Sequence, residues 1–239
     1  MWRMTRGERL PPPVHADLTD TVRDLWLARV AQHEFDWYAG VRLLKFPEDL
    51  RAYEHLLWLS NASVVIEIGA RFGGSALWFR DRLRTLQSYG LIDRPLVVSI
   101  DIEPELAREG VLAADPTSDG IEVIGGDVTD PELPDRVATL VPDGARCLVI
   151  EDSAHIYDTT LAALKGFTRF VPPGGFFVVE DGCVDVDELR LKEDWPRGVL
   201  PALHDWLSTE QGAAFVVRDD LELYGLSCHP NGFLQRRYA

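Results

Sequence analysis

Two short apolar runs with a helical stretch between them constrain the possible fold of this chain most. Residues 147–150 and 176–179 carry no charge and are rich in β-branched or aromatic side chains, which is typical of strands buried in a parallel sheet. Residues 159–170 between them predict a crossover helix. Because neighbouring parallel strands end at the same edge of a sheet, we expect the residues that follow the two runs to lie close together.

The same alternation extends through most of the sequence. Further strands are expected at 64–68, 96–100 and 121–124, and a closing hairpin at 214–217 and 226–234. Helices are expected at 18–32, from Pro47, and at 75–86, 103–112, 131–140 and 200–209. Strands that alternate with helices predict an α/β fold, here a doubly wound, mostly parallel, seven-stranded Rossmann-like sheet. We divide the chain into an N-terminal helical extension or lid, residues 1–60, and a main domain, residues 61–239.

Charge and cysteine content narrow the class of partner and the compartment. The formal net charge is -15, from 24 basic and 39 acidic residues. Nucleic acid and anionic membranes would be repelled by such a field, so a small-molecule substrate is expected. Cys147, Cys183 and Cys228 are odd in number and lack paired spacing, which predicts reduced thiols in a cytoplasmic setting. The polar start of the sequence indicates neither a signal peptide nor a membrane span.

The first strand-to-helix turn contains the glycines of a nucleotide-type site with one exception. Gly69 and Gly74 fit the dinucleotide pattern, but Arg71 replaces its middle glycine. A long side chain there would obstruct a pyrophosphate, which disfavours a nicotinamide cofactor. S-adenosylmethionine has no phosphate, so it is compatible with this turn. We assign Gly69, Arg71, Gly73 and Ser75 to its binding surface.

Three acidic residues accompany this turn along successive strands. Glu67 is placed to anchor the cofactor's ammonium, directly or through water. Asp101 is placed to bind the ribose hydroxyls, and Asp127 to lie at the edge of the adenine. Each aspartate could instead be an ordinary turn or helix-cap residue, which is the commoner role at a strand end. It is the position of one carboxylate at each of three strand ends that favours S-adenosylmethionine.

A second acidic group follows the two apolar runs. Asp152 and His155 come after the first run, and Glu180 and Asp181 come after the second. Converging carboxylates favour a hard divalent ion, Mg²⁺ ahead of Mn²⁺. A neutral histidine can accept a proton from a metal-bound hydroxyl near neutral pH. Taken singly, His155 could be an ordinary surface or core residue and the Glu180-Asp181 pair a solvated loop start.

Several motifs together make the sequence similar to a known family. Ordered along the chain are Lys45-Phe46-Pro47-Glu48-Asp49 with Tyr53, Glu67-Ile68-Gly69, Asp152-Ser153-Ala154-His155, and Pro173-Gly174-Gly175 followed by Glu180-Asp181. This order resembles the cephalosporin hydroxylase-like family, which includes metal-dependent sugar O-methyltransferases of the rhamnosyl and mycinamicin types. The resemblance extends from Trp37 almost to the end of the chain.

The resemblance implies a class I methyltransferase fold, with residues 61–239 as its domain, and a homo-oligomer. By position it implies that Asp152, Glu180 and Asp181 hold magnesium and that His155 removes the proton. The expected reaction is O-methylation of a sugar or another natural-product intermediate, and vicinal hydroxyls would suit chelation by the metal. The stretch 182–199 should cover the active site, but it matches no member of known substrate.

Two alternative functions remain open at this point. A non-catalytic accessory protein could bind the cofactor only to stabilise a larger assembly, although three converging carboxylates would then repel one another without a cation. A nicotinamide-dependent oxidoreductase is disfavoured by Arg71. Four residues before the main domain could form a lid or subunit contact, namely Trp37, Tyr38, Lys45 and Phe46. The aromatic ones among them could instead simply pack against the sheet.

Overall fold

The computed structural model describes residues 21–190, 193–225 and 227–238. Its centre is a seven-stranded sheet in the order β5-β4-β3-β6-β7-β9-β8. The parallel strands are β3 (Val64–Ile68), β4 (Leu96–Asp101), β5 (Ile121–Gly125), β6 (Cys147–Glu151) and β7 (Phe176–Val179). The last two, β8 (Phe215–Val217) and β9 (Phe233–Arg236), pair antiparallel with each other, and β9 also pairs antiparallel with β7. The predicted fold class is confirmed.

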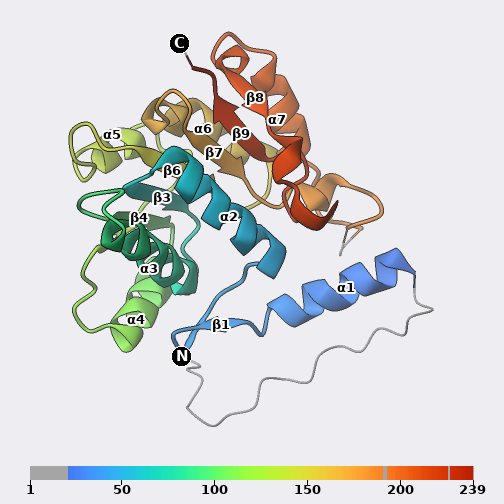
Figure 1. Ribbon diagram of the computed structural model, residues 1–239. Coiled ribbons are helices and arrows are strands. Elements are labelled where there is room, and N and C mark those ends of the chain that lie inside the picture. The colour runs from blue at the N-terminus through green and yellow to red at the C-terminus, as the bar shows by residue number, and fades with distance from the viewer. Residues whose placement is uncertain (1–20, 191–192, 226, 239) are drawn as a thin grey trace.

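Helices cover both faces of the sheet (Figure 1). One face packs against α2 (Pro47–Ser60), α3 (Gly74–Ser88) and α4 (Glu105–Ala114), and the other packs against α5 (Leu133–Ala138), α6 (Tyr157–Phe167) and α7 (Val199–Leu207). Strands β3 and β6 are buried on both faces, which explains why their sequences are continuously apolar apart from Glu67 and Glu151. Those two buried carboxylates therefore stand out as functional candidates.

The N-terminal segment forms one helix and a short hairpin. Helix α1 (Val22–His33) starts after Thr21, whose side chain and that of Asp24 form a capping box. The predicted start at residue 18 lies outside the described residues. Strands β1 (Trp37–Tyr38) and β2 (Val41–Arg42) form a hairpin that periodicity did not predict, because two residues are too short to show alternation.

Helix α2 is an integral part of the folded core. Pro47 occupies its first turn, where proline is well tolerated. Tyr53, Leu56 and Leu57 are fully buried against the sheet and α3. In contrast, α1 and the β1–β2 hairpin lie outside the sheet layers (Figure 1). The division of the chain at residue 60 stays a prediction.

The closing hairpin differs from its prediction in one strand. The strand expected at 226–234 is present only from Phe233, and a 3-10 helix (Leu223–Gly225) and turn precede it. Cys228 and His229 are buried beside Asp49 and Asp181 because this turn folds back over the sheet edge. The irregular turn before β9 thus brings Cys228 and His229 to the site.

Candidate active site

The carboxyl ends of β3, β4, β6 and β7 form the floor of a cavity of about 610 Å³. Its walls include the glycine turn after β3, Asp101 after β4, Asp127 after β5, and the residues that follow β6 and β7. Its position is that expected for a ligand site in an open α/β sheet. Its volume falls within the usual range for small-molecule pockets.

Backbone geometry at the glycine turn explains its residue types. Gly69 has a φ of +106°, and a Cβ there would lie 1.8 Å from the carbonyl oxygen of Asp152. Gly73 has a φ of +82° and caps α3. Arg71 also has a positive φ, +40°, a conformation that is unfavourable for an arginine. The missing side chain at Gly69 therefore allows the backbone just after β6 to pass close to this turn.

Asp101 supports this turn as well as facing the cavity. One of its carboxylate oxygens accepts a hydrogen bond from the N–H of Arg71 at 2.8 Å, and the other accepts one from the N–H of Glu103 at 2.9 Å. Asp127 is exposed, and the Thr129 N–H and hydroxyl bind one of its oxygens. These bonds lower the pKa of Asp127. Both aspartates thus combine a turn role with cavity lining, and Ser75 lines the same cavity.

Glu67 is fully buried beneath the cavity and is not part of its lining. The Ser99 hydroxyl donates to its Oε2 at 2.5 Å, while Oε1 has no hydrogen-bond partner among the described residues. Burial raises the pKa of Glu67 to about 7, although Lys45 and the two nearby serines oppose that shift. The structure therefore places Glu67 under the predicted cofactor surface and does not bring it to that surface.

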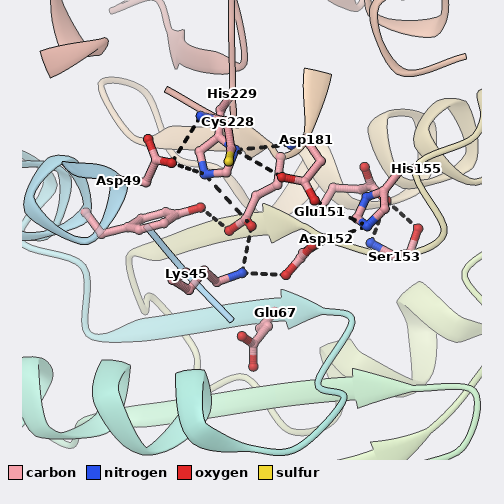
Figure 2. Close-up of polar contacts among 12 residues, drawn as sticks. Lys45, Asp49, Glu67, Glu151, Asp152, Ser153, His155, Asp181, Cys228 and His229 are labelled. Atoms are coloured by element: carbon pink, nitrogen blue, oxygen red, sulfur yellow. Dashed lines mark hydrogen bonds and ion pairs between the residues drawn. The ribbon is translucent and has the colours of Figure 1, made fainter. Parts of the chain in front are cut away.

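The acidic residues after β6 and β7 form one continuous polar network (Figure 2). The Lys45 ammonium bridges Asp152 and Glu180, at 2.6 Å from Glu180 Oε2. Tyr53 donates to the other oxygen of Glu180. His155 Nε2 lies 3.3 Å from Asp181 Oδ2 and 3.9 Å from Asp152 Oδ1. The three predicted metal ligands and the predicted base thus lie together at one edge.

The predicted ligands differ in their present partners. Asp152, His155 and Asp181 each offer one atom within 4.8 Å of the other two, as do Glu180, Asp181 and His229. Glu180 is only 2% exposed, and both of its oxygens are engaged by Lys45 and Tyr53. Asp181 belongs to both groups and therefore connects them.

Burial and charge shift the protonation equilibria of this network. Burial and the neighbouring Glu180 raise the pKa of Asp152, against the opposing effect of Lys45. Burial works to lower the pKa of His155, but the carboxylates around it, Asp181 foremost, raise it overall. The pKa of Lys45 is held well above its usual range by Asp152 and Glu180, which outweigh its burial. The electrostatic potential at this edge of the sheet is therefore negative.

Backbone strain coincides with this network. His155 and Asp181 have φ values of +55° and +57°, in the left-handed region that costs a side-chain-bearing residue about 1–2 kcal/mol. Strain of this kind persists where the surroundings enforce it, often at functional sites. The two residues face each other from adjacent strand ends, so the strain directs both side chains toward the same point.

A second, smaller cavity of about 220 Å³ adjoins the first. Helix α1 and the 182–199 segment form its walls through Trp26, Val30, Leu189 and Trp195, and Cys183 and Cys228 complete them. His155 and Asp181, with His33 and Glu34, line both cavities. The segment expected to cover the active site does border this smaller cavity.

Four residues of the network were not predicted to belong to the site. Lys45, Asp49 and Tyr53 occur in the motif that supported the family resemblance, and the i,i+4 spacing of Asp49 and Tyr53 places them on one face of α2. His229 had no sequence signal, since its approach depends on the turn before β9. Its Nδ1 accepts a hydrogen bond from the N–H of Asp181 at 3.1 Å.

Similarity to known proteins agrees with this architecture. A family model described as rhamnosyl O-methyltransferase/CmcI matches residues 30–237. The rhamnosyl O-methyltransferase of Mycobacterium tuberculosis (strain ATCC 25618 / H37Rv) is 28% identical over 156 residues, which cover 62% of this chain and 57% of the relative. The chain therefore matches less than two thirds of that relative's length.

Two solved structures of CmcI share the fold. The apo-structure of its N160 form has a TM-score of 0.60 and 24% identity, covering 96% of this chain and 90% of CmcI. The D160 form with Mg and SAM has a TM-score of 0.57 and 23% identity, covering 95% of this chain and 89% of CmcI.

Among the described residues of this chain, no helix is both long and apolar enough to cross a bilayer.

Proposed function

This chain belongs to the rhamnosyl O-methyltransferase/CmcI family, and from that premise we propose that it is an S-adenosylmethionine- and Mg²⁺-dependent O-methyltransferase. Its acceptor is a small molecule with vicinal hydroxyls, either a sugar or another natural-product intermediate. One observation carries the proposal: His155 and Asp181 line both cavities, so a general base and a carboxylate stand where two ligands would meet.

The larger cavity is the proposed cofactor site. Gly69, Arg71 and Ser75 line the cavity, whereas Gly73 caps α3 and does not belong to the lining. Asp101 and Asp127 supply carboxylates for the ribose and adenine. Glu67 does not line the cavity, so its proposed contact with the cofactor's ammonium would run through water at Oε1, which has no hydrogen-bond partner among the described residues. A volume of about 610 Å³ accommodates a molecule the size of S-adenosylmethionine. The CmcI structure with Mg and SAM supports this assignment by analogy of fold.

The donor set at the sheet edge fits a hard divalent cation. Asp152, Glu180 and Asp181 would hold it, because oxygen donors are preferred by Mg²⁺ and Mn²⁺. A bound cation would make the acceptor hydroxyl more acidic and orient it toward the methyl donor. Four carboxylates, including Asp49, face a single lysine and two histidines here. That excess of negative charge is what a divalent ion would offset.

His155 performs the proton transfer in the proposed reaction. The acceptor oxygen forms a bond to the methyl carbon while the carbon–sulfur bond breaks, and S-adenosylhomocysteine leaves. The hydroxyl proton passes to Nε2 of His155, the ring nitrogen that faces Asp152 and Asp181. Those carboxylates stabilise the imidazolium that results. Proton transfer of this kind contributes about 10²- to 10⁴-fold to a rate.

The smaller cavity is the proposed acceptor site. It measures about 220 Å³ and is lined by Trp26, Phe46 and Trp195 together with His155. Aromatic walls suit the apolar face of a sugar ring, while the polar edge at Asp181 suits its hydroxyls. The space is that of one ring, which favours methylation of a single terminal sugar or a similarly small group. We further propose a homo-oligomer, which light scattering during size exclusion tests.

Calorimetry with S-adenosylmethionine tests the proposal most directly. We expect micromolar binding to the purified protein, and binding of S-adenosylhomocysteine at the same site. The protein is then incubated with cofactor, MgCl₂ and a panel of deoxysugar glycosides and nucleotide-linked deoxysugars. Mass spectrometry should show a product heavier by one methylene group. Absence of cofactor binding under all metal conditions would refute the proposal.

An Asp101→Asn variant provides the matched control for the binding experiment. Asparagine keeps one acceptor oxygen, enough for the backbone hydrogen bond from Arg71 but not also for the one from Glu103, and it removes the negative charge. Weaker cofactor binding with an unchanged melting temperature would assign the cofactor to the larger cavity. Unchanged affinity would show that the cofactor binds elsewhere.

A further inference from the structure

Two cysteines and one carboxylate meet at the wall of the smaller cavity. Cys183, Cys228 and Asp181 each offer one ligand atom, and these atoms lie within 4.8 Å of one another. The cysteines are 45 residues apart in sequence, but both are buried, both are free thiols, and both line the cavity. No step of the proposed methyl transfer uses either thiol.

We propose that Cys183, Cys228 and Asp181 form a second metal site, selective for a thiophilic ion of the Zn²⁺ class. Zinc binds thiolate sulfur at about 2.3 Å and carboxylate oxygen at about 2.0–2.2 Å in tetrahedral geometry. Two sulfurs on one tetrahedral ion are then about 3.8 Å apart. The observed grouping within 4.8 Å needs only a small contraction to reach that geometry.

The backbone around these residues already fixes their relative positions. The N–H of Cys183 donates to the carbonyl of Cys228 at 3.1 Å, which joins the two segments directly. The N–H of Cys228 donates to Asp49 Oδ2 at 3.2 Å, and the N–H of Asp181 donates to His229 Nδ1 at 3.1 Å. A site whose ligands are held in this way loses little conformational freedom on binding.

Ligand chemistry separates this site from the proposed magnesium site. Mg²⁺ prefers hard oxygen donors, whereas two thiols select Zn²⁺, Cd²⁺ or Cu⁺. Three protein ligands leave one tetrahedral position open toward the cavity, as in zinc sites that exchange a water or a substrate. The metal binds as two thiol protons leave, so that both sulfurs become thiolates. No oxidant or reductant is required.

Asp181 gives the second site a consequence for the first. This part of the inference rests on the proposed function, because it assumes that Asp181 also binds Mg²⁺. A thiophilic ion that takes Asp181 weakens the magnesium site and occupies the wall of the acceptor cavity. We therefore infer that zinc inhibits the enzyme by competing with both Mg²⁺ and the acceptor.

Titration with CdCl₂ tests the site without any methyl transfer. The reduced protein, free of Mg²⁺ and cofactor, should bind one equivalent and develop the ultraviolet charge-transfer absorption of cadmium thiolates. Cys183→Ala and Cys228→Ala should each lose at least tenfold in affinity, and the double variant should lose the absorption. Cys147→Ala is the control, because Cys147 is buried in β6 and lines neither cavity.

A second measurement keeps the test valid if an alanine variant fails to fold. Zinc should protect Cys183 and Cys228 of the wild-type protein from alkylation, as read by peptide mass spectrometry. Absence of the cadmium absorption, its persistence in the double variant, or equal alkylation with and without zinc would overturn the site. Excess Mg²⁺ should weaken cadmium binding through Asp181. If it has no effect while the absorption persists, the two thiols still bind the metal, but Asp181 does not serve both sites and the proposed competition with Mg²⁺ fails.

Discussion

The two cavities that meet at His155 and Asp181 are built from different kinds of structure. The larger one is formed mostly by residues at the carboxyl ends of parallel strands, so the sheet topology itself creates it. The smaller one is formed by α1, the 182–199 segment and the turn before β9, which lie outside the strand–helix alternation. The sheet topology thus determines the proposed donor site, whereas segments outside the strand–helix alternation determine the proposed acceptor site.

Replacement of His155, the proposed base that lines both cavities, should produce the largest effect. His155 has a φ of +55°, and asparagine tolerates this region better than alanine does. His155→Asn should therefore retain the backbone while removing the base. We expect turnover to fall about 10²- to 10⁴-fold, with cofactor affinity changed by less than about threefold. Steady-state rates and calorimetry measure the two quantities separately.

The outcome of that variant also tests the boundary between the cavities. Wild-type turnover would eliminate His155 as the base. A parallel loss of cofactor binding would show that His155 belongs to the donor side rather than to the wall between the two sides.

Lys45 should have the next largest effect, because it is the cation that now bridges Asp152 and Glu180. Lys45→Met leaves two carboxylates, one of them deeply buried, without their counter-ion. Breaking such a pair typically costs about 3–5 kcal/mol of unfolding free energy. If the same carboxylates bind Mg²⁺, magnesium should restore part of that loss. Chemical denaturation with and without MgCl₂ measures both effects.

Lys165→Met is the matched control for Lys45→Met. Lys165 is exposed on α6, so its replacement should change the stability by less than about 0.5 kcal/mol. Equal stability of the two variants would contradict the bridging role of Lys45. Stabilisation of Lys45→Met by sodium chloride as strong as that by magnesium would argue against a specific cation site.

Glu67 should make the donor side sensitive to pH. Its pKa is about 7 in the folded protein, mainly because of burial, against a usual value near 4.5. The folded state therefore keeps this proton to a higher pH than the unfolded state does. Between pH 4.5 and 7 the unfolding free energy falls as pH rises, by about 1.4 kcal/mol per unit and about 3 kcal/mol in all. The contribution is then constant above pH 7.

Glu67→Gln isolates this contribution from those of other groups. Urea denaturation at pH 5 and pH 7.5 gives the stability difference between wild type and variant at each pH. We expect the difference to change by about 2–3 kcal/mol in favour of the glutamine variant as pH rises. A difference independent of pH would show that the pKa of Glu67 is not raised.

Asp101 should have a more moderate effect, confined to the cofactor. A hydrogen bond to a charged group contributes about 1.5–3 kcal/mol, so Asp101→Asn should weaken S-adenosylmethionine binding about 10- to 100-fold. The Cd²⁺ affinity of the cysteine pair should stay unchanged, because Asp101 lines only the larger cavity. Calorimetry with each ligand checks the separation. Weakening of both would contradict the independence of the two cavities.

The same division accounts for what could be predicted from the sequence. Buried strands such as β3 and β6 were identified because a short, continuous apolar run is typical of a strand covered on both faces. The site residues after β6 and β7, among them Asp152 and Asp181, were found because topology fixes where a strand ends. The site residues that were missed, Lys45 and His229 among them, reach the network through packing of the segment just before α2 and of an irregular turn. Periodicity carries no information about such packing.

The cysteines illustrate the same limit. Cys183 and Cys228 were interpreted as scattered thiols because no spacing connects them. Their proximity depends on a hydrogen bond between the backbone after β7 and the turn before β9. Since that turn was predicted as part of a strand, the contact between the two thiols could not be anticipated.

The smallest expected effect concerns the connection that holds the acceptor side together. Trp26 Nε1 donates to the carbonyl of Leu189 at 2.7 Å, and Arg23 donates to the carbonyl of Asp187 at 2.9 Å. These bonds join α1 to the 182–199 segment across the smaller cavity. Trp26→Phe keeps most of the buried ring and removes one hydrogen bond, which should cost about 0.5–1.5 kcal/mol.

We expect this variant to raise the KM for the acceptor a few-fold, because the hydrogen bond restrains one wall of its cavity. The affinity for S-adenosylmethionine should stay within about twofold, since Trp26 does not line the larger cavity. Leu25→Ala is a suitable control, because Leu25 is 40% exposed on the same helix and borders neither cavity. If Trp26→Phe weakened cofactor binding as strongly as it raised the acceptor KM, the two cavities would be coupled through α1. The acceptor side would then be part of the donor site rather than an addition to it.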